Sequence, residues 1–284
     1  MLRTVIGLKG TEHTIARDLP TTLIGERINP TNKRAFAEEL EAGAFDTVRR
    51  LARAQKEAGA HILDVNVGTG TVDEVKVLPE AVRVAWEEAG LPVCIDSTNV
   101  AATEAALALF PGKALVNSVN GEEQSLSRLL PVVKRYGAAV VGLTMDEGGI
   151  PDSAERRLEI ARKIVSRAEE AGIPREDVII DPLTISAATD SSAGRVTLEA
   201  VRRISEELGV NVVLGASNVS FGLPERTVVN AAFLAMAIAA GMSAVITDVT
   251  NVNLRKAILA SDVLVGRDDF AMRYLGHYRA TQRG

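Results

Sequence analysis

Short apolar runs alternate with longer amphipathic segments along the whole chain. Eight runs are rich in Val, Ile and Leu and stay nearly free of polar residues until their last positions, which is typical of parallel strands buried on both faces. The segments between them have helical periodicity, and several end at a glycine suited to a left-handed helix cap. The predicted strands span residues 22–28, 61–67, 92–98, 114–119, 138–145, 178–184, 211–217 and 243–249, and the clearest helices span 46–58, 72–89, 153–171 and 226–240.

Eight strand–helix units in succession, with no change in composition between them, predict an α/β fold, a single closed (β/α)8 TIM barrel. An open doubly wound sheet is the alternative. No Gly-x-Gly-x-x-Gly or P-loop pattern follows the first strand, and this disfavours such a sheet. We assign residues 1–284 to one domain, in which residues 1–20 are an N-terminal extension expected to form a hairpin.

Composition narrows the functional classes. The chain carries a net charge of −5 without a basic stripe, so nucleic acid is not an expected partner. It has one cysteine, Cys94, and its start lacks the pattern of a secretory signal; we expect a cytoplasmic protein without disulfides. Residues 228–247 are uncharged and long enough to span a bilayer. Asn230 and Gly241 interrupt this stretch, so we expect a buried helix followed by a buried strand, and no contact with a membrane.

Polar residues collect where the predicted strands end. In a barrel these ends meet at one mouth, where barrel enzymes hold their active sites. Asp96 and Asp181, each directly after an apolar run, are the strongest candidates. A buried carboxylate costs free energy unless it is paired, so a ring of such residues requires mutual partners or a ligand. The acids and amides at strand ends are Glu26, Asn29, Asp64, Asn66, Asp96, Asn99, Asn117, Asn120, Asp146, Asp181, Asn218 and Asp248.

The Asp and Asn character of these ends favours a neutral heterocycle as ligand. Carboxylates accept hydrogen bonds from amino and ring N–H groups, and an Asn amide both donates and accepts, so the edge of a pterin fits. A phosphate does not fit, because few cations stand at the strand ends. We expect no bound metal, since no histidine lies among these residues; an oxygen-only magnesium site is the competing interpretation of the clustered Asp.

Four of the candidates also have a purely structural interpretation. Asp64 and Asn66 either contact a ligand or tie neighbouring loops together. Asn99 is placed to cap the helix that follows it. Arg226 lies near a predicted helix start, where it forms either a surface ion pair or a ligand contact.

Seven motifs, in order, give the chain a family likeness. Each motif is weak alone, but together they stand at the ends of consecutive predicted strands. They resemble the methyltetrahydrofolate:corrinoid methyltransferases and the folate-binding domain of cobalamin-dependent methionine synthase, over about residues 22 to 265. The motifs are IGERIN (24–29), LDVNVG (63–68), IDSTN (95–99), VNS (116–118), GLTM (142–145), IDPL (180–183) and LGASNVSFGLP (214–224).

The resemblance implies a barrel of the pterin-binding type and a role for individual residues. It implies that Asp96, Asn117 and Asp181 hydrogen-bond the pterin. It implies that Asn218 hydrogen-bonds the ring nitrogen that carries the methyl group, which makes it the expected catalytic residue. The expected substrate-binding set is Asp96, Asn117, Asp181, Gly215, Ser217 and Arg226, together with Asp64 and Asn66 from the strand-end pattern.

The resemblance also implies substrates and partners. The methyl group would move, in either direction, between methyltetrahydrofolate and the cobalt of a corrinoid protein. The chain has no room for a cobalamin domain, so we expect a partner protein to supply the cobalamin. The family is usually homodimeric, and we expect the same here. An amide cannot supply a proton, so we expect water or a hydrogen-bond network to protonate the nitrogen beside Asn218.

Two other functions remain open from the sequence. Dihydropteroate synthases use a similar barrel, but they carry a Ser-Arg-Lys-Ser stretch after the seventh strand, where this chain has Ala216-Ser217-Asn218-Val219. The missing Lys removes the positive charge that an anionic leaving group requires. A non-catalytic protein that binds a pterin or a corrinoid protein would need the polar ring but not Asn218.

Overall fold

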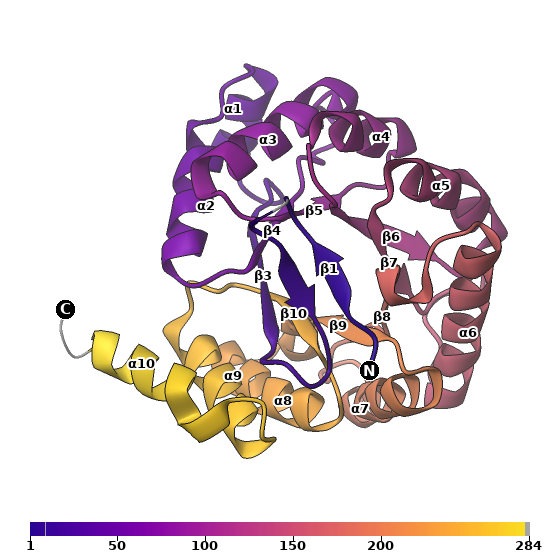
Figure 1. The fold of residues 1–284 in the computed structure, drawn as a ribbon, viewed down its shortest axis with the longest axis vertical. Helices are drawn as coiled ribbons and strands as arrows, with labels where there is room; N and C mark the ends of the chain where they lie inside the picture. The colour runs from indigo at the N-terminus through magenta and orange to yellow at the C-terminus, as the bar shows by residue number, and fades with distance from the viewer. Residues whose placement is uncertain (9, 282–284) are drawn as a thin grey trace.

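Eight parallel strands, β3 to β10, close into one barrel, as predicted (Figure 1). The computed structural model describes residues 1–8 and 10–281. The strand order around the barrel is β10-β3-β4-β5-β6-β7-β8-β9, so the last strand pairs with the first. The strands are β3 (Thr22–Ile28), β4 (Ile62–Val65), β5 (Val93–Asp96), β6 (Leu115–Asn120), β7 (Ala139–Leu143), β8 (Val178–Asp181), β9 (Asn211–Gly215) and β10 (Ala244–Thr247).

Helices surround the barrel as an outer layer (Figure 1). The amphipathic segments predicted from the sequence form α2, α3, α6 and α8. Gly90 ends α3 with a φ of 66°, a left-handed conformation that glycine adopts without steric cost. The helices are α1 (Arg34–Glu41), α2 (Asp46–Glu57), α3 (Glu74–Ala89), α4 (Val100–Leu109), α5 (Glu123–Tyr136), α6 (Ala154–Glu170), α7 (Ala193–Arg203), α8 (Arg226–Ala239), α9 (Val252–Leu264) and α10 (Met272–Thr281).

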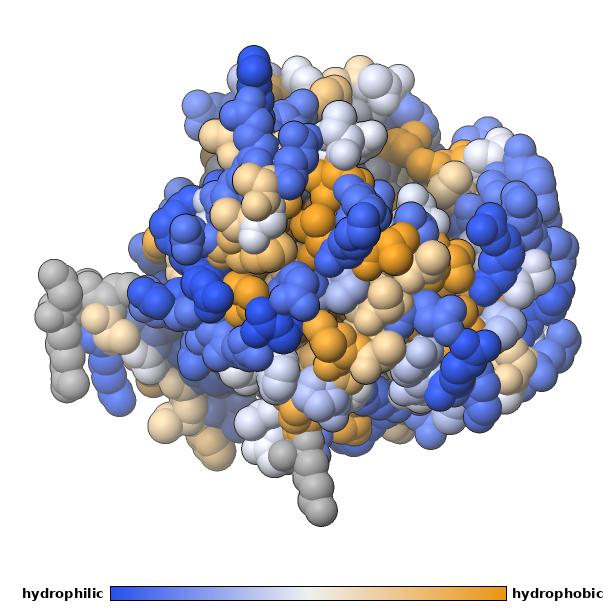
Figure 2. All heavy atoms as spheres, turned by 90° about the horizontal axis from the view of Figure 1, so that it is seen from above, coloured by the Kyte–Doolittle hydropathy of each residue, from blue (hydrophilic) through white to orange (hydrophobic). Residues whose placement is uncertain are grey.

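The two faces of the strands build two apolar cores. Side chains alternate along a strand, so one set, which includes Leu63 and Val93, packs beneath the helices. The other set fills the barrel, with Ile24, Ile62 and Leu115 among its members. Because both sets are apolar, the strands appear in the sequence as continuous hydrophobic runs. Hydrophilic side chains cover most of the outer surface seen in Figure 2.

A hairpin closes the end of the barrel at which the strands begin. Strands β1 (Thr4–Ile6) and β2 (His13–Ile15) pair antiparallel and lie in front of the barrel in Figure 1. Ile6 and Ile15 join the apolar cluster inside the barrel. The buried Asn211 amide donates to Thr4 Oγ1 and to the Ile15 carbonyl, both at 2.9 Å. The hairpin therefore leaves the opposite end as the open mouth.

The uncharged stretch at residues 228–247 forms most of α8 and all of β10. A helix followed by a strand is what the interruption at Gly241 predicts. Among the described residues, no helix combines the length and the apolar character needed to cross a bilayer.

Candidate active site at the barrel mouth

The inward-facing position above the apolar layer is polar on most strands. Because alternate residues face the barrel axis, Asp64 follows Ile62, and Asp96 follows Cys94. Strands β7 and β9 are the exceptions, because Leu143 and Gly215 stand at this level. Neighbouring strands align these residues, with Asp96 paired in register with Asn117, and Leu143 with Asp181. The residues at this level, called the mouth ring below, are Glu26, Asp64, Asp96, Asn117, Leu143, Asp181, Gly215 and Asp248.

Asp64, Asn66 and Asp96 form one side of the mouth ring. The Asn66 amide donates to Asp96 Oδ2 at 3.0 Å, and its oxygen accepts from Gly68 N at 2.8 Å. Asn66 therefore ties its loop to a ring carboxyl, and its contact with a ligand stays a prediction. Asp64 is 3% exposed, and its Oδ1 has no hydrogen-bond partner among the described residues. Burial and the neighbouring Asp96 charge raise the pKa of Asp64 well above its usual range, and burial raises the pKa of Asp96.

Asp181 forms the opposite side of the ring. Its Oδ1 accepts from Leu183 N at 2.7 Å. Burial raises the pKa of Asp181 to about 6, against the opposing effect of backbone hydrogen bonds and Arg157. Removing a carboxylate from water without a cation in direct contact produces this shift.

Arg157 was not predicted from the sequence, because it stands among the charged residues of an ordinary helical pattern. It is fully buried in α6. Its guanidinium donates to the carbonyls of Pro182 and Leu183 at 3.1 and 2.9 Å and to Thr197 Oγ1 at 3.0 Å. It holds the loop that follows Asp181, so its effect on the site runs through the backbone.

Asn218 lies beyond the end of its strand. Strand β9 ends at Gly215, two residues before the predicted end, and a 3-10 turn, η3 (Ala216–Ser220), follows. Within this turn the Asn218 side chain is exposed. A Cβ added at Gly215 would meet no atom within 4 Å, so the mouth is open beside the backbone there. A flat ligand has room to approach both the Gly215 backbone and the Asn218 amide.

Arg226 braces the same turn. Its Nη2 donates to the Ser217 carbonyl at 2.8 Å, and its Nε donates to Ser220 Oγ at 3.0 Å. The guanidinium also lies 5.9 Å from the centre of the Phe221 ring. The structure records no carboxylate partner for it among the described residues, so the surface ion pair that the sequence left open is not formed. Ser217 takes part through its carbonyl.

Glu26 and Asp248 complete the ring, although neither belongs to the predicted binding set. Burial, followed by the negative charge of Asp248, raises the pKa of Glu26. Asp248 pairs with Arg27 at 3.3 Å across the β3–β10 junction. The alternation of β3 was the available signal: Glu26 is two residues beyond Ile24, which lies inside the barrel.

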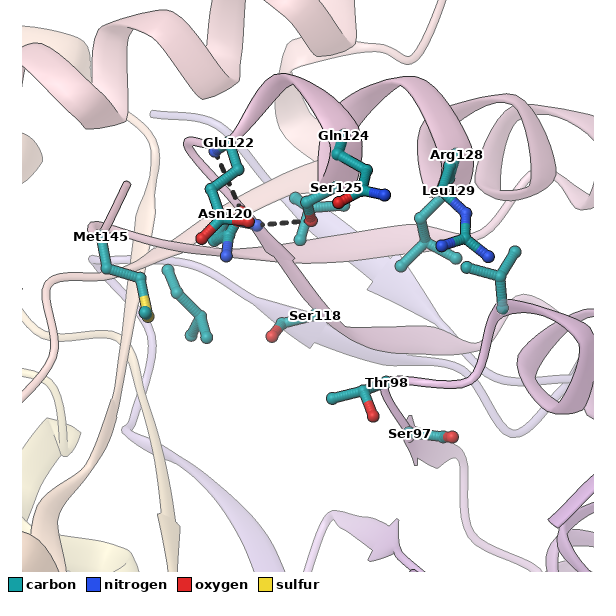
Figure 3. A pocket seen from close by; sticks show the side chains of 13 residues that line it. Ser97, Thr98, Ser118, Asn120, Glu122, Gln124, Ser125, Arg128, Leu129 and Met145 are labelled. Carbon is teal, nitrogen blue, oxygen red and sulfur yellow. Dashed lines mark hydrogen bonds between the residues drawn. The ribbon is translucent and has the colours of Figure 1, made fainter. Parts of the chain in front are cut away.

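A cleft of 370 Å³ opens beside the ring, over the ends of β5, β6 and β7 (Figure 3). Ser97, Thr98 and Ser118 line its floor, and α5 forms a wall with Gln124, Ser125 and Arg128. The Asn120 oxygen accepts from Glu122 N at 3.0 Å at the start of α5. The polar side chains that line the cleft are mostly hydroxyls and amides, and its one cation, Arg128, has no carboxylate partner among the described residues.

Two other strand-end residues point away from the ring. Asn99 Oδ1 accepts from Ala101 N and Ala102 N, so it caps α4. Asp146 lies beyond the end of β7, where it accepts from Gly148 N at 3.0 Å and pairs with Arg156 at 2.8 Å. No group of three His, Cys, Asp or Glu side chains in the described part of the chain is arranged to hold a metal ion.

The chain is similar to known proteins in sequence and in fold. The family model described as pterin binding enzyme matches residues 25–248, a span that contains every residue of the mouth ring and also Asn218. The chain belongs to the family of pterin-binding enzymes. This confirms the family resemblance seen in the seven motifs.

Two individual proteins are similar to this pterin-binding enzyme in sequence. It is 31% identical over 270 residues to the methylcorrinoid:tetrahydrofolate methyltransferase of Eubacterium limosum, covering 92% of this chain and 97% of that protein. It is 33% identical over 253 residues to the methionine synthase of Mycobacterium tuberculosis, covering 84% of this chain but only 21% of the synthase. The match to the first relative therefore extends over nearly the whole of both proteins.

Solved structures share the fold at lower identity. A dihydropteroate synthase of Xanthomonas albilineans with 4-aminobenzoic acid superimposes with a TM-score of 0.69 at 21% identity, covering 93% of this chain and 98% of that one. A Yersinia pestis dihydropteroate synthase with a pterine-sulfa conjugate gives a TM-score of 0.68 at 16% identity, covering 93% and 99%. At these identities the likeness concerns the barrel alone.

Proposed function

We propose that this protein transfers a methyl group between methyltetrahydrofolate and a corrinoid protein, in either direction. The observation that carries the proposal is the mouth ring, in which Asp96, Asn117 and Asp181 stand around one opening with acceptor atoms left for a ligand. The near full-length likeness to a methylcorrinoid:tetrahydrofolate methyltransferase supports the reaction class. We place the activity in the cytoplasm, within one-carbon metabolism, and in one domain that spans the chain.

The ring carboxyls suit the pyrimidine part of the pterin. An ionised carboxylate accepts from an amino group and a ring N–H, and the Asn117 amide donates and accepts at the same edge. Raised pKa values at Asp96 and Asp181 mean that these groups are poorly satisfied without ligand. Pterin N–H donors would stabilise their ionised forms. Gly215, Ser217 and Arg226 would form the wall of the site, and Asp64 and Asn66 would support Asp96 from the adjacent strand β4 and the loop that follows it.

Asn218 is the residue that we assign to the reaction. The cobalt(I) of the corrinoid gives its electron pair to the methyl carbon, while the carbon–nitrogen bond breaks and its electron pair stays on the folate nitrogen, which takes a proton. A tertiary amine leaves poorly until it is protonated, so a group that stabilises the protonated nitrogen lowers the barrier. The Asn218 oxygen accepts from a protonated nitrogen, and rotation of the amide lets it donate to an unprotonated one.

We further propose that the corrinoid is supplied by a separate protein and that the chain forms a homodimer. Large apolar side chains are exposed at the junction of α9 and α10: Leu264 is 86% exposed, Phe270 94% and Met272 63%. Burying such side chains against a second copy would remove their apolar area from water. Light scattering of the Leu264→Glu, Phe270→Ser variant tests this, since a charge in the interface should leave a monomer.

The decisive experiment is a spectroscopic methyl-transfer assay. Cob(I)alamin and methyltetrahydrofolate are mixed with the protein, and the loss of the cob(I)alamin absorbance is followed in time. We expect turnover with methyltetrahydrofolate and none with a dihydropterin pyrophosphate and 4-aminobenzoate. The reverse result, condensation of those two without methyl transfer, would replace our proposal by a dihydropteroate synthase activity. Tight pterin binding with neither reaction would indicate a binding protein.

A further inference from the structure

A cationic groove lies at the rim of the mouth outside β3, between the first turns of α1 and α2. Its volume is 390 Å³, and its floor is formed in part by Phe36 and Leu51. One carboxylate lines it, that of Glu39. The positively charged side chains that line it are Arg27, Lys33, Arg34 and Arg50, and they define the cationic groove below.

The positive charge of this groove is only partly compensated. Glu39 is occupied at the start of α2, where it accepts from Thr47 N at 2.7 Å and Thr47 Oγ1 at 2.5 Å. Within the described residues, Lys33 Nζ donates to backbone carbonyls alone, those of Arg27 at 3.3 Å and Asn29 at 2.8 Å. Burial and the nearby Arg27 charge lower the pKa of Lys33, and the negative charges of Asp248 and Glu26 oppose this shift only in part.

The remaining two cations differ from each other. Arg34 forms an exposed i,i+4 pair with Glu38 at 2.7 Å, an interaction of small net worth that an incoming anion can replace. Arg50 has no hydrogen bond or ion pair among the described residues. Bound carboxylates would therefore gain attraction from Lys33 and Arg50 without breaking an existing buried pair.

The groove stands on the side of the mouth where the folate side chain would leave. The barrel order places β9, β10 and β3 side by side. In a folate, the benzoyl-glutamate tail is attached to the carbon next to the methyl-bearing nitrogen. With that nitrogen at Asn218, after β9, and the pyrimidine edge held from β5, β6 and β8, the tail is directed toward β10 and β3. The cleft of Figure 3, with Arg128, lies across the ring over β5 to β7.

We propose that the cationic groove binds the glutamate tail of the folate substrate and makes the protein select folates that carry several glutamates. Each glutamate joined through its γ-carboxyl adds one carboxylate, and the groove offers several cations in a row at the rim. The inference rests on the proposed function, because the position of the tail follows from the position of the pterin.

The test compares mono- and triglutamate forms of methyltetrahydrofolate by calorimetry. We expect the wild-type protein to bind the triglutamate about 3- to 10-fold more tightly, as a few solvent-exposed ion pairs allow. This preference should shrink as salt rises, because salt screens exposed charges. The Arg34→Gln, Arg50→Gln double variant should lose most of the preference. Neither change disturbs the fold, since neither side chain holds a buried partner.

The matched control is Arg128→Gln, which removes an unpaired, exposed cation from the other side of the mouth and should keep the wild-type preference. Equal binding of both forms by the wild-type protein, or an unchanged preference in the double variant, would overturn the inference. So would loss of the preference in Arg128→Gln, which would assign the tail to the other cleft. If instead neither folate binds and the monoglutamate donates no methyl group, the proposed function itself is wrong.

Discussion

The two ends of the barrel differ in how far their buried polar groups are hydrogen-bonded. At the hairpin end, the Asn211 amide donates both of its hydrogens, to Thr4 and to the Ile15 carbonyl, and the apolar side chains of Ile6 and Ile15 cover the opening. At the mouth, Asp64 has a buried oxygen without a hydrogen-bond partner in the part of the chain that the structure describes, and the pKa of Asp181 is raised to about 6. Polar groups that the chain satisfies itself hold the fold, and those it leaves unsatisfied await a ligand.

The largest effect expected at the mouth comes from Asn218→Ala. The Asn218 hydrogen bond should strengthen as the folate nitrogen gains charge. Its removal should therefore lower kcat by roughly 10- to 1000-fold, as removal of single polar stabilisers does in other enzymes. The same change should weaken substrate binding by a smaller factor. Single-turnover transfer to cob(I)alamin measures this. Asn99→Ala is the control, since Asn99 caps α4 at the same end and should affect melting rather than rate. A full rate in a destabilised Asn218→Ala protein would mean that Asn218 only braces its turn.

The ring carboxyls should come next. Asp96→Ala or Asp181→Ala should weaken methyltetrahydrofolate binding by ~1.5–3 kcal/mol, the usual worth of a charge-assisted hydrogen bond. Calorimetry on the folded variants gives the value. Asp146→Ala removes an aspartate that follows β7 but pairs with Arg156 outside the ring, and it should bind normally. Unchanged affinity in the ring variants would show that the pterin is held elsewhere.

At the hairpin end the expected effect is on stability alone. Asn211→Ala leaves the Ile15 carbonyl and Thr4 Oγ1 without this donor in a buried place, and such losses cost ~1–3 kcal/mol. Denaturant unfolding should record that decrease, while the affinity for methyltetrahydrofolate stays within about twofold after correction for the folded fraction. A loss of affinity in Asn211→Ala without a loss of stability would contradict a purely structural role for the hairpin end.

The ionisation of Asp181 predicts opposite pH trends for binding and for stability. Pterin N–H donors need the carboxylate, so affinity should fall about tenfold from pH 7 to pH 5, through the pKa of about 6. The pKa of Asp181 in the folded protein lies above the ordinary value of an aspartate, so the ligand-free protein should lose stability as pH rises from about 4 to 6. Asp181→Asn should flatten both curves. A binding curve that stays steep in this variant would assign the titration to Asp64, Asp96 or Glu26.

The smallest expected effect is that of chelation. Magnesium would be another way to satisfy the ring carboxyls, but we expect a pterin to do so and no bound metal to take part. EDTA should leave the rate of methyl transfer unchanged. Loss of activity with EDTA and its return with magnesium would support the oxygen-only site instead.

The sequence predicted the barrel because the strands are apolar on both faces and the helices are amphipathic. The spacing of hydrophobic positions therefore distinguishes the strands from the helices. It predicted the ring at Asp96 and Asp181, which directly end their strands. It placed Asp146 among the ring residues wrongly, because β7 ends at Leu143 and the chain then turns outward. Where a strand ends depends on the geometry of the loop that follows it, and the hydrophobic pattern does not show that geometry.

The ion pair at the junction of β3 and β10 was also beyond the sequence. Arg27 and Asp248 are far apart in the chain, and they meet only because β10 closes against β3. Arg157 is hidden for a different reason: its helix carries many arginines, and only packing decides which of them is buried. The specific roles of Asn218 and the other site residues stay predictions.

The closure of the barrel determines when the mouth is completed during synthesis of the chain. Strand β3 finds its second neighbour only when β10 has been made, since Thr22 aligns with Ala244, and such a non-local pairing is a late step in folding. Glu26 and Asp248 stand on these two strands, so the ring is completed by the same contact. A nascent chain that has left the ribosome as far as β9 already holds Asp96, Asn117 and Asp181, yet it has an open seam and an unfinished mouth.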